Sequence, residues 1–441
     1  MSSLDLHSQG RAVRRLLWWV PPFAAIATAW AGPSVYPTGV TRYDPLKAYH
    51  CDFLFTAANQ KTYLIGMNGH VLHEWDKGGF PAKMLDPKLT GGIKGIIGVK
   101  TARVPAGSHA GSVYRLPGFN VTYADLTFGY VNWQGKTLWQ WGTQAPGGAV
   151  LQHHDWEKLP NGDTLILGSR VDQPRALGKR LVMDPVIYDV NQAGHVVWSW
   201  RASQHLKGVG FTGAKLELLA HGTDPDYLQM NDMRTLGPNR WAASGDKRFA
   251  PDNIIVSSRT GNFLAIISRK TGHVVWRMGP TFPRRKAGLF WTLGKKPPFK
   301  VDGFSGQHDA HLIPEGLPGA GNLLVLDDEG EGGYPPADLP VLSGSRVLEI
   351  NPVTRNVVWE YAGTKRTFFT PFEGSVQRLP NGNTLIDEAI WGRFFQVTPA
   401  GKIAWEYVSP YVRKGPAHLE YVPWTYRVQA VPYSWVPDKA R

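Results

Sequence analysis

The hydrophobic and polar positions of this chain follow a short phrase that occurs six times. In each copy a turn precedes aliphatic residues and a tryptophan, and most copies carry another aromatic residue two positions later. The copies are NGHVLHEW (68–75), QGKTLWQW (134–141), AGHVVWSW (193–200), TGHVVWRM (271–278), TRNVVWEY (354–361) and AGKIAWEY (400–407). Their shared tryptophans are Trp75, Trp139, Trp198, Trp276, Trp359 and Trp405. A β-rich phrase that recurs behind a tight turn indicates one supersecondary unit used again and again.

The stretch 152–201 shows the unit most clearly. It predicts four strands, in QHHDWEKL, in TLILGS after the turn LPNGD, in PVIYDVN and in HVVWSWR. A four-stranded antiparallel blade repeated around an axis is a β-propeller, so the copies predict an all-β fold with six blades. The alternative is a pair of β-sandwiches whose tryptophans fill the cores, and six ordered copies disfavour it.

The N-terminus predicts an export signal. Arginines precede an apolar run over 16–31 that ends in Ala-Trp-Ala, which predicts cleavage before Gly32. The chain then divides into a signal peptide, 1–31, and one propeller domain, 32–441, located in the periplasm and not stably inserted in the membrane. The run contains two prolines and is short for a membrane span, but an uncleaved anchor is the competing interpretation.

Composition narrows the function further. The net charge of +13 comes from scattered basic residues, with no basic stripe, which argues against nucleic-acid binding. Cys51 is the only cysteine, which excludes an internal disulfide, Cys-based zinc sites and iron–sulfur clusters. We find no motif for a metal or a cofactor and expect neither. The oligomeric state is open, with a homodimer as one alternative.

Two histidines occupy matching positions in two of the units. His154 in QHHDWEKLP and His308 in GQHDAHLIP each lie six residues before the proline of the turn phrase. Because blades are related by rotation about the axis, equivalent positions lie at the same depth, so we expect both imidazoles to converge on the central channel. Strand alternation turns Asp155 and Asp309 away from them, as acceptors of blade-to-blade hydrogen bonds. A single histidine on a strand is more often structural, and the matching register is what favours a functional role.

Polar residues of the fourth unit fall at the same level. In DYLQMN, strand alternation puts Gln229 and Asn231 on one face and Met230 on the other. Arg259 ends the apolar strand NIIVSSR, a place where a lone arginine usually forms a salt bridge at the rim. The acidic run at 327–331 lacks the spacing of an EF-hand, so we expect a solvated loop and no calcium site.

Long segments of the chain resemble the bacterial arylsulfotransferase family, whose members use aryl sulfate esters as sulfuryl donors. The resemblance runs through most of the mature chain in the right order. It is carried by GVTRYDPLKAY (39–49), KTYLIGMNGHVLHEW (61–75), HHDWEKLPNGDTLIL (153–167), PDNIIVSSRTGNFLAIISRKTGHVVWRMGP (251–280), GQHDAHLIPEGLPGAGNLLVLDDEG (306–330) and LPNGNTLIDEAIWGRFFQVTPAGKIAWEYVSPY (379–411).

The resemblance implies a six-bladed propeller with a funnel-shaped site on its axis and a ping-pong reaction through a sulfated histidine. The family's Gly-Gln-His-Asp phrase places this nucleophile at His308. Its His-His-Asp phrase places a supporting histidine at His154, with His153 beside it, and its Ser-Ser-Arg phrase places an arginine at Arg259. The family's remaining histidine belongs to an Asp-Trp-x-His-x-Asn phrase, in which Gln229 stands here in the place of the histidine.

The residue types suit this chemistry. An aryl sulfate spreads one negative charge over three oxygens, and a free imidazole, with its usual pKa of about 6.5, can attack the sulfur at neutral pH. We therefore expect a small aryl sulfate and a phenol as partners, with Gln229, Asn231 and His153 in contact with substrate. The alternatives are a propeller that binds without catalysis, suggested by Gln229, and a quinoprotein-like propeller dehydrogenase, which would need a redox cofactor.

Overall fold

The computed structural model describes residues 37–101, 114–116, 119–121, 127–142, 145–146, 150–178, 180–280, 297–301, 303–330, 332, 344–362, 367–413 and 422–438. The predicted signal peptide, 1–31, lies outside them. Within these ranges, no helix is both long enough and apolar enough to cross a membrane.

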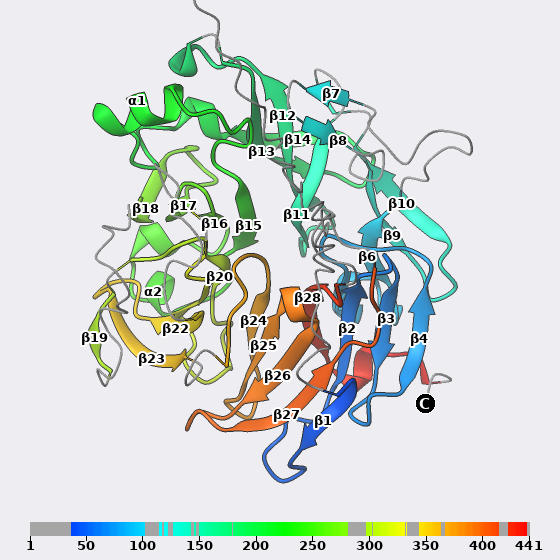
Figure 1. Ribbon diagram of the computed structural model, residues 1–441. Coiled ribbons are helices and arrows are strands. Elements are labelled where there is room, and N and C mark those ends of the chain that lie inside the picture. Colours follow the sequence, from blue (N-terminus) through cyan, green and yellow to red (C-terminus); the bar gives the residue numbers. More distant parts are fainter. Residues whose placement is uncertain are drawn as a thin grey trace, which may run out of the picture.

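Six antiparallel sheets surround a common axis, which confirms the predicted six-bladed propeller (Figure 1). From the inside outward, the first three blades are β28 (Thr425–Val431), β2 (Asp52–Ala57), β3 (Thr62–Ile65) and β4 (Val71–Trp75); β5 (Lys83–Met84), β6 (Ile97–Lys100), β9 (Phe128–Val131) and β10 (Thr137–Trp141); and β11 (Leu151–Lys158), β12 (Thr164–Asp172), β13 (Val182–Val190) and β14 (Val196–Arg201). The third blade contains the four strands that the sequence predicts over 152–201.

The other three blades follow the same order. They are β15 (Met230–Thr235), β16 (Ile254–Ser258), β17 (Phe263–Ile267) and β18 (Val274–Met278); β20 (His308–Leu312), β21 (Leu323–Asp327), β22 (Arg346–Ile350), β23 (Asn356–Ala362) and β19 (Phe299–Lys300); and β24 (Ser375–Arg378), β25 (Thr384–Glu388), β26 (Arg393–Val397), β27 (Ile403–Val408) and β1 (Gly39–Tyr43). Outside the blades are a hairpin of β7 (Tyr114–Leu116) and β8 (Phe119–Val121), the α-helices α1 (Ala214–Ala220) and α2 (Arg240–Ala243), and 3-10 turns at Pro87–Leu89, Arg175–Leu177, Ala202–Gln204, Lys247–Phe249, Ala389–Trp391 and Tyr433–Trp435.

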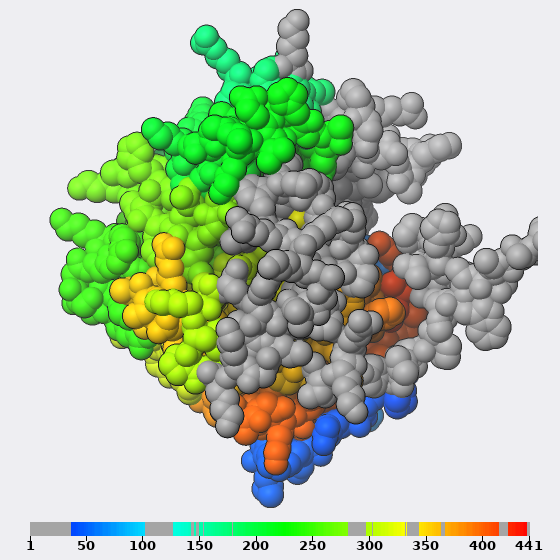
Figure 2. Space-filling view, turned by 60° about the vertical axis from the view of Figure 1, so that its left-hand side comes forward, coloured from blue at the N-terminus to red at the C-terminus, as the bar shows by residue number. Residues whose placement is uncertain are grey.

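The two ends of the chain close the ring. The C-terminal strand β28 becomes the innermost strand of the first blade by pairing with β2. The N-terminal strand β1 adds a fifth strand to the last blade by pairing with β27. In Figure 2 the N-terminal part of the chain, in blue, adjoins the orange C-terminal part at the lower edge. Each end of the chain therefore ties the first blade to the last.

The repeated tryptophans join each blade to the next. Trp75 donates its indole N–H to the carbonyl of Asn132 in the turn before β10 of the neighbouring blade, at 3.1 Å. The same bond recurs around the ring, from Trp141 to Gly194, Trp200 to Gly272, Trp276 to Pro352, Trp359 to Pro399 and Trp405 to Met67. The last bond returns to the first blade. In the second and third blades the donor is thus the tryptophan two positions after the shared Trp139 and Trp198. The turn and the tryptophan recur together because one tryptophan of each blade binds the turn of the following blade.

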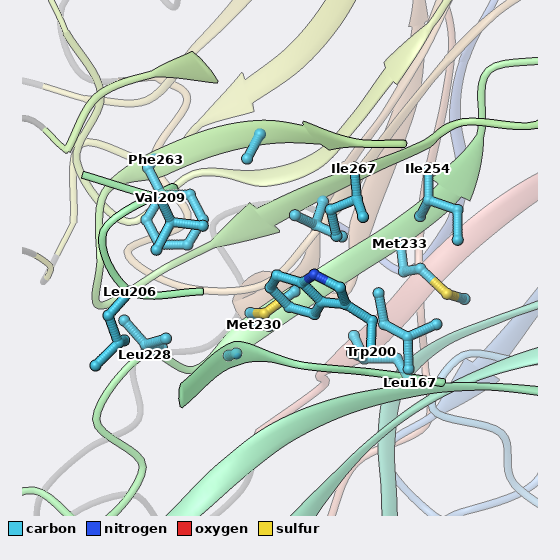
Figure 3. Packing of buried hydrophobic residues seen from close by; sticks show 14 of the residues in the cluster. Leu167, Trp200, Leu206, Val209, Leu228, Met230, Met233, Ile254, Phe263 and Ile267 are labelled. Carbon is cyan, nitrogen blue, oxygen red and sulfur yellow. The ribbon is translucent and has the colours of Figure 1, made fainter. Parts of the chain in front are cut away.

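Apolar side chains fill the spaces between blades. Figure 3 shows one such core, in which Trp200 and Leu167 of the third blade face Met230, Met233 and other residues of the fourth. All four side chains are buried. Burying this surface stabilises the propeller by about 25 cal/mol per Å² of apolar area. The blades are therefore held rigidly, and the inner strands keep fixed positions around the axis.

Candidate functional site

The inner strands begin with a kink that re-aims their side chains. A non-glycine residue with positive φ occurs in the first half of five of them or just before the first residue: His154 (67°), Gln229 (41°), Asp309 (49°), Glu373 (66°) and Arg427 (49°). Such backbone costs about 1–3 kcal/mol per residue and concentrates at functional sites. The register of β11, β20 and β28 shifts at these points, as in a β-bulge. We call this end of the channel the site end.

His308, the first residue of β20, is buried at the site end between two partners. Its Nδ1 lies 2.6 Å from Oδ2 of Asp328, and its Nε2 accepts a hydrogen bond of 3.2 Å from the backbone N–H of Glu373. Because Nε2 accepts, the imidazole proton is on Nδ1 and is donated to Asp328. The arrangement leaves a lone pair on Nε2, the atom that faces away from the carboxyl group.

The charge state of His308 follows from its surroundings. Burial, assisted by the positive charge of Arg259, lowers the pKa of His308 well below its usual range. Burial and the neighbouring Asp327 raise the pKa of Asp328. Both directions disfavour a charged imidazolium, so the imidazole is a neutral base at pH 7. A neutral imidazole held by a carboxyl group is the form required of a nucleophile.

Arg259 and Gln229 contact each other beside His308. Arg259 Nη1 donates to Oε1 of Gln229 at 2.6 Å, and its backbone N–H donates to the Gln229 carbonyl at 3.0 Å. The guanidinium also lies over the ring of Phe372, 5.9 Å from its centroid. Because a guanidinium can only donate, the Gln229 amide presents its oxygen to Arg259. Gln229 therefore orients the arginine.

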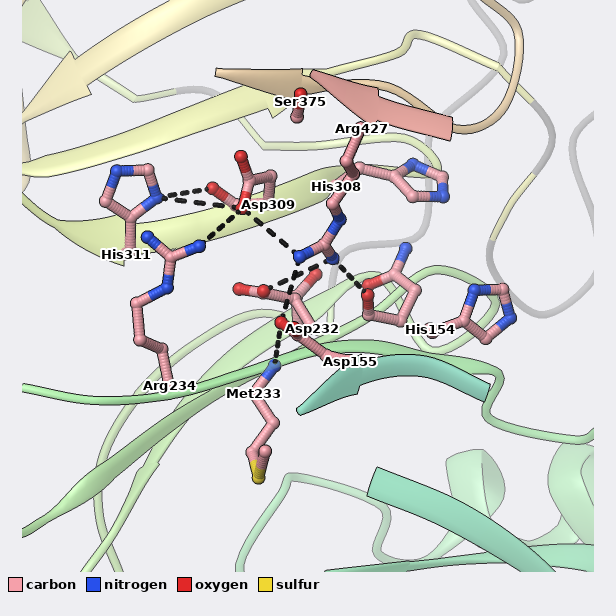
Figure 4. A network of polar contacts seen from close by, with 12 residues as sticks. His154, Asp155, Asp232, Met233, Arg234, His308, Asp309, His311, Ser375 and Arg427 are labelled. Atoms are coloured by element: carbon pink, nitrogen blue, oxygen red, sulfur yellow. Dashed lines mark hydrogen bonds and ion pairs between the residues drawn. The ribbon is translucent and has the colours of Figure 1, made fainter. Parts of the chain in front are cut away.

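His154 lies on β11 in an aromatic environment. Its Nδ1 is 3.1 Å from the hydroxyl oxygen of Tyr426, and its ring packs 4.8 Å from that of Phe80. Phe80 stacks in turn on Tyr426 at 3.8 Å. Figure 4 shows His154 and His308 on one side of Arg427 and His311 on the other. The side chain of His153, on the same strand, lies outside what the structure describes.

Asn231 has a different environment from the other predicted site residues. It is fully buried on β15, and its Nδ2 donates to the Gln307 carbonyl at 2.8 Å. Gln307 directly precedes His308, so this contact helps to fix the start of β20. The structure thus places Asn231 behind the site, where it positions the backbone that carries His308.

Asp155 and Asp309 join neighbouring blades through the backbone, as their strand positions predict. Asp155 accepts a hydrogen bond from the Met233 N–H at 3.2 Å, and Asp309 accepts one from the Val376 N–H at 2.8 Å. Arg427 of β28 lies between them, 2.9 Å from Asp155 and 3.4 Å from Asp309 (Figure 4). This ion-pair network crosses the axis below the site end.

A cavity of about 350 Å³ lies at the other end of the inner strands. Lys83, Arg234, His311 and Gln429 are among the residues that line it. None of the predicted site residues does. The ion-pair network around Arg427 borders this cavity, so the network divides it from the site end.

The acidic run after β21 was wrongly predicted to be a solvated loop. Asp327, Asp328 and Glu329 are buried. Asp327 and Glu329 bind Arg346, with shortest N···O distances of 2.9 and 3.2 Å, while Asp328 holds His308. Burial is possible because each carboxyl group has a cationic or N–H partner. The signal that could have found Asp328 is its position directly after the strand that pairs with the His308 strand.

Glu373 and the aromatic residues near it also escaped the sequence analysis. Trp424 donates its indole N–H to Oε2 of Glu373, and Trp424 lies 6.1 Å from the ring of Phe80. Burial raises the pKa of Glu373 to about 7, although the Trp424 hydrogen bond and Arg259 oppose that shift. These residues lie outside the recurring phrases, and no local pattern marks them.

The arrangement suits transfer of an anionic group to nitrogen. It combines a neutral imidazole, a fixed guanidinium, an aromatic wall of Phe80, Trp424 and Tyr426, and a carboxyl group that titrates near neutral pH. In the described part of the chain, no three His, Cys, Asp or Glu side chains are grouped as metal ligands.

Comparisons with known proteins identify a family. A family model described as Arylsulfotransferase (ASST) matches residues 119–410, more than half of the chain. No curated protein matches the sequence. Among solved structures, a protein of unknown function from Bacteroides caccae is similar with a TM-score of 0.45 and 12% identity, covering 86% of this chain and 98% of its own. Virginiamycin B lyase from Staphylococcus aureus is similar with a TM-score of 0.37 and 11% identity, covering 90% and 96%.

Proposed function

Because the chain belongs to the arylsulfotransferase family, we propose that it moves a sulfuryl group from an aryl sulfate to a phenol through a sulfated His308. The observation that carries the proposal is the pairing of His308 Nδ1 with buried Asp328, which leaves Nε2 unprotonated. Nε2 attacks the sulfur, and the aryl oxygen leaves with the electron pair of its bond to sulfur. The acceptor phenol then takes the sulfuryl group from the histidine.

The surrounding side chains have distinct roles in this proposal. Arg259 holds the sulfuryl oxygens with a planar pair of donors. The backbone N–H of Glu373 donates to Nε2 in the free protein. Once Nε2 is bonded to sulfur, this N–H can donate to a sulfuryl oxygen instead. Phe80, Trp424 and Tyr426 stack against the aryl ring of donor and acceptor. As in phosphoryl transfer, catalysis then depends mainly on positioning and electrostatic stabilisation.

The nucleophile can be tested with a matched pair of histidines. His308→Asn should abolish nitrophenolate release from p-nitrophenyl sulfate, and wild-type protein incubated with donor should carry the added sulfuryl mass on the peptide with His308. His311→Asn is the control, because His311 is buried three residues later on the same strand but lines the opposite cavity. Unchanged turnover in His308→Asn, with both variants folded, would show that another residue accepts the sulfuryl group.

A propeller that binds aryl sulfates without turning them over is the second candidate. The observation in its favour is that Gln229 occupies one donor of Arg259, which is then less available to a sulfuryl oxygen. This candidate predicts binding of aryl sulfate without release of phenol and without a labelled histidine. We also propose that the protein acts after export to the periplasm, on the basis of its N-terminal sequence.

A further inference from the structure

Transfer between two phenols requires a group that can hold a proton at the aryl oxygen. The leaving phenol has an ordinary pKa of about 10, so its oxygen gains a proton on leaving, and the acceptor phenol must lose one. Arg259 cannot serve, because a guanidinium stays protonated, and the Gln229 amide does not titrate. Asp328 is bound to Nδ1, on the far side of the imidazole from the reacting nitrogen.

Glu373 lies on the reacting side of His308. Its backbone N–H contacts Nε2 directly, and its φ of 66° marks the kink just before β24. The side chain is half-buried and its Oε2 accepts the indole N–H of Trp424. The carboxyl group is thereby anchored by one oxygen beside the aromatic wall, and the other oxygen is available for a proton.

Charged and titratable groups surround this carboxyl group on several elements. They are Arg259 after β16, Arg413 after β27, Asp328 after β21, Asp387 on β25, Tyr426 on β28 and His308 on β20. The two arginines favour the carboxylate, while burial favours the acid. Burial wins by enough to raise the pKa of Glu373 to about 7, where both forms are populated at neutral pH.

We propose that Glu373 carries the proton between the leaving aryl oxygen and the incoming phenol, an inference that rests on the proposed sulfuryl transfer through His308. Glu373 is then a catalytic residue of the site. His154, which the family resemblance makes a supporting residue, is the competing proton carrier, and its described contacts run to Tyr426 and Phe80.

The proton balance closes over the two half-reactions. In the first, Nε2 of His308 bonds to sulfur, the bond from sulfur to the aryl oxygen breaks, and the electron pair stays on that oxygen. The Glu373 carboxyl group gives its proton to this oxygen, and a neutral phenol leaves. In the second, the carboxylate takes the acceptor's hydroxyl proton while the phenol oxygen bonds to sulfur. The N–S bond breaks, its electron pair returns to Nε2, and Glu373 is protonated again.

The two half-reactions have opposite pH dependence in this scheme. Sulfation of His308 by phenyl sulfate needs the acid and should fall as the pH rises above about 7, the pKa of Glu373. Transfer from sulfated protein to phenol needs the carboxylate and should fall as the pH drops below about 7. Each half-reaction can be followed by rapid quenching and mass analysis of the histidine peptide. Glu373→Gln should remove both pH limbs.

A series of donors separates proton transfer from mere positioning. A nitrophenolate leaves without help, so Glu373→Gln should change sulfation by p-nitrophenyl sulfate by less than about tenfold. Phenyl sulfate needs the proton, and its rate should fall by about 10²–10⁴-fold. Glu373→Asp should restore part of the loss. Glu388→Gln is the matched control, because the pKa of Glu388 is also raised to about 7 but its carboxyl group is paired with Arg393.

The outcomes are distinguishable. Equal losses with both donors, or pH limbs near 7 that persist in Glu373→Gln, overturn the role of Glu373. If His154→Asn loses rate with phenyl sulfate but not with p-nitrophenyl sulfate, and Glu373→Gln does not, then His154 is the proton carrier. If wild-type protein does not become sulfated on His308 with any aryl sulfate, the proposed function fails and this inference fails with it.

Discussion

Two buried histidines on one strand show how the partner of an imidazole decides its use. His308 donates Nδ1–H to a buried carboxyl group, whereas His311 Nδ1 lies 2.8 Å from the backbone carbonyl of Asp309. Burial lowers the pKa of both, that of His311 to about 4. The Asp309 carboxyl group is 3.9 Å from His311 Nδ1, so of the two histidines only His308 has a carboxyl oxygen at hydrogen-bond distance. That oxygen can stabilise the positive charge that develops on the ring when Nε2 bonds to sulfur.

Removing that carboxyl group should impair the chemistry more than binding. In Asp328→Asn the amide can donate to Nδ1, which favours the tautomer with its proton on the reacting nitrogen. We expect kcat for aryl sulfate transfer to fall by about 10²–10⁴-fold with KM little changed. Asp327→Asn should lower the thermal stability more than kcat, because Asp327 binds Arg346 and the Ser305 N–H. Steady-state kinetics and thermal unfolding of both variants provide the comparison.

At the scale of elements, the outer strand of each blade is defined by its tryptophan. The indole packs between blades, and its N–H reaches a turn carbonyl of the next blade. The bond from Trp276 to Pro352 is buried, at 2.9 Å, whereas the bond from Trp359 to Pro399, at 2.8 Å, is exposed to solvent. The same interaction therefore occurs in two dielectric environments, so its contribution should differ between them.

Replacing each tryptophan by phenylalanine tests this difference. Trp276→Phe leaves a buried carbonyl without its donor and should lower the free energy of unfolding by about 1–3 kcal/mol beyond the lost packing. In Trp359→Phe water can replace the indole N–H, so the loss of unfolding free energy beyond the lost packing should be small. Urea denaturation of both variants measures the difference. Equal destabilisation would mean that packing alone joins the blades.

The elements that could be predicted from sequence are those that repeat. The turn and tryptophan phrases mark every blade, and the phrases QHHDWEKLP and GQHDAHLIP show that His154 and His308 occupy matching positions. Asp328 was missed because an acidic run after a strand usually meets solvent, and only pairing of β20 with β21 brings it behind His308. Glu373 and Trp424 come from non-repeating segments far apart in the chain, so their meeting depends on closure of the ring.

At the scale of the whole molecule, closure and the site share one strand. β28 completes the first blade, and it also supplies Tyr426 beside His154 and Arg427 at the centre of the ion-pair network. Burial works to raise the pKa of Asp155, but Arg427 and Lys83 outweigh it and hold it well below its usual range. The buried carboxyl groups of several blades can therefore gather around the axis only when β28 is in place to supply Arg427.

Arg427→Met should show how much of the ring depends on this contact. The variant leaves Asp155, Asp232 and Asp309 buried without their shared cation, for which we expect a loss of about 3–5 kcal/mol in unfolding free energy. Arg248→Met, at an exposed pair with Asp246, should cost less than about 1 kcal/mol.

A second substitution separates charge from packing. If unpaired charge is the cause, adding Asp155→Asn to Arg427→Met should recover part of the loss, and a double-mutant cycle should give a coupling energy of the same order as a buried ion pair. Urea denaturation at one pH measures all four proteins. Strictly additive losses would mean that Arg427 fills space at the axis and that the backbone pairing of β28 with β2 closes the ring without it. In that case the site end should also keep its activity in Arg427→Met, because His308, Asp328 and Glu373 would remain in place.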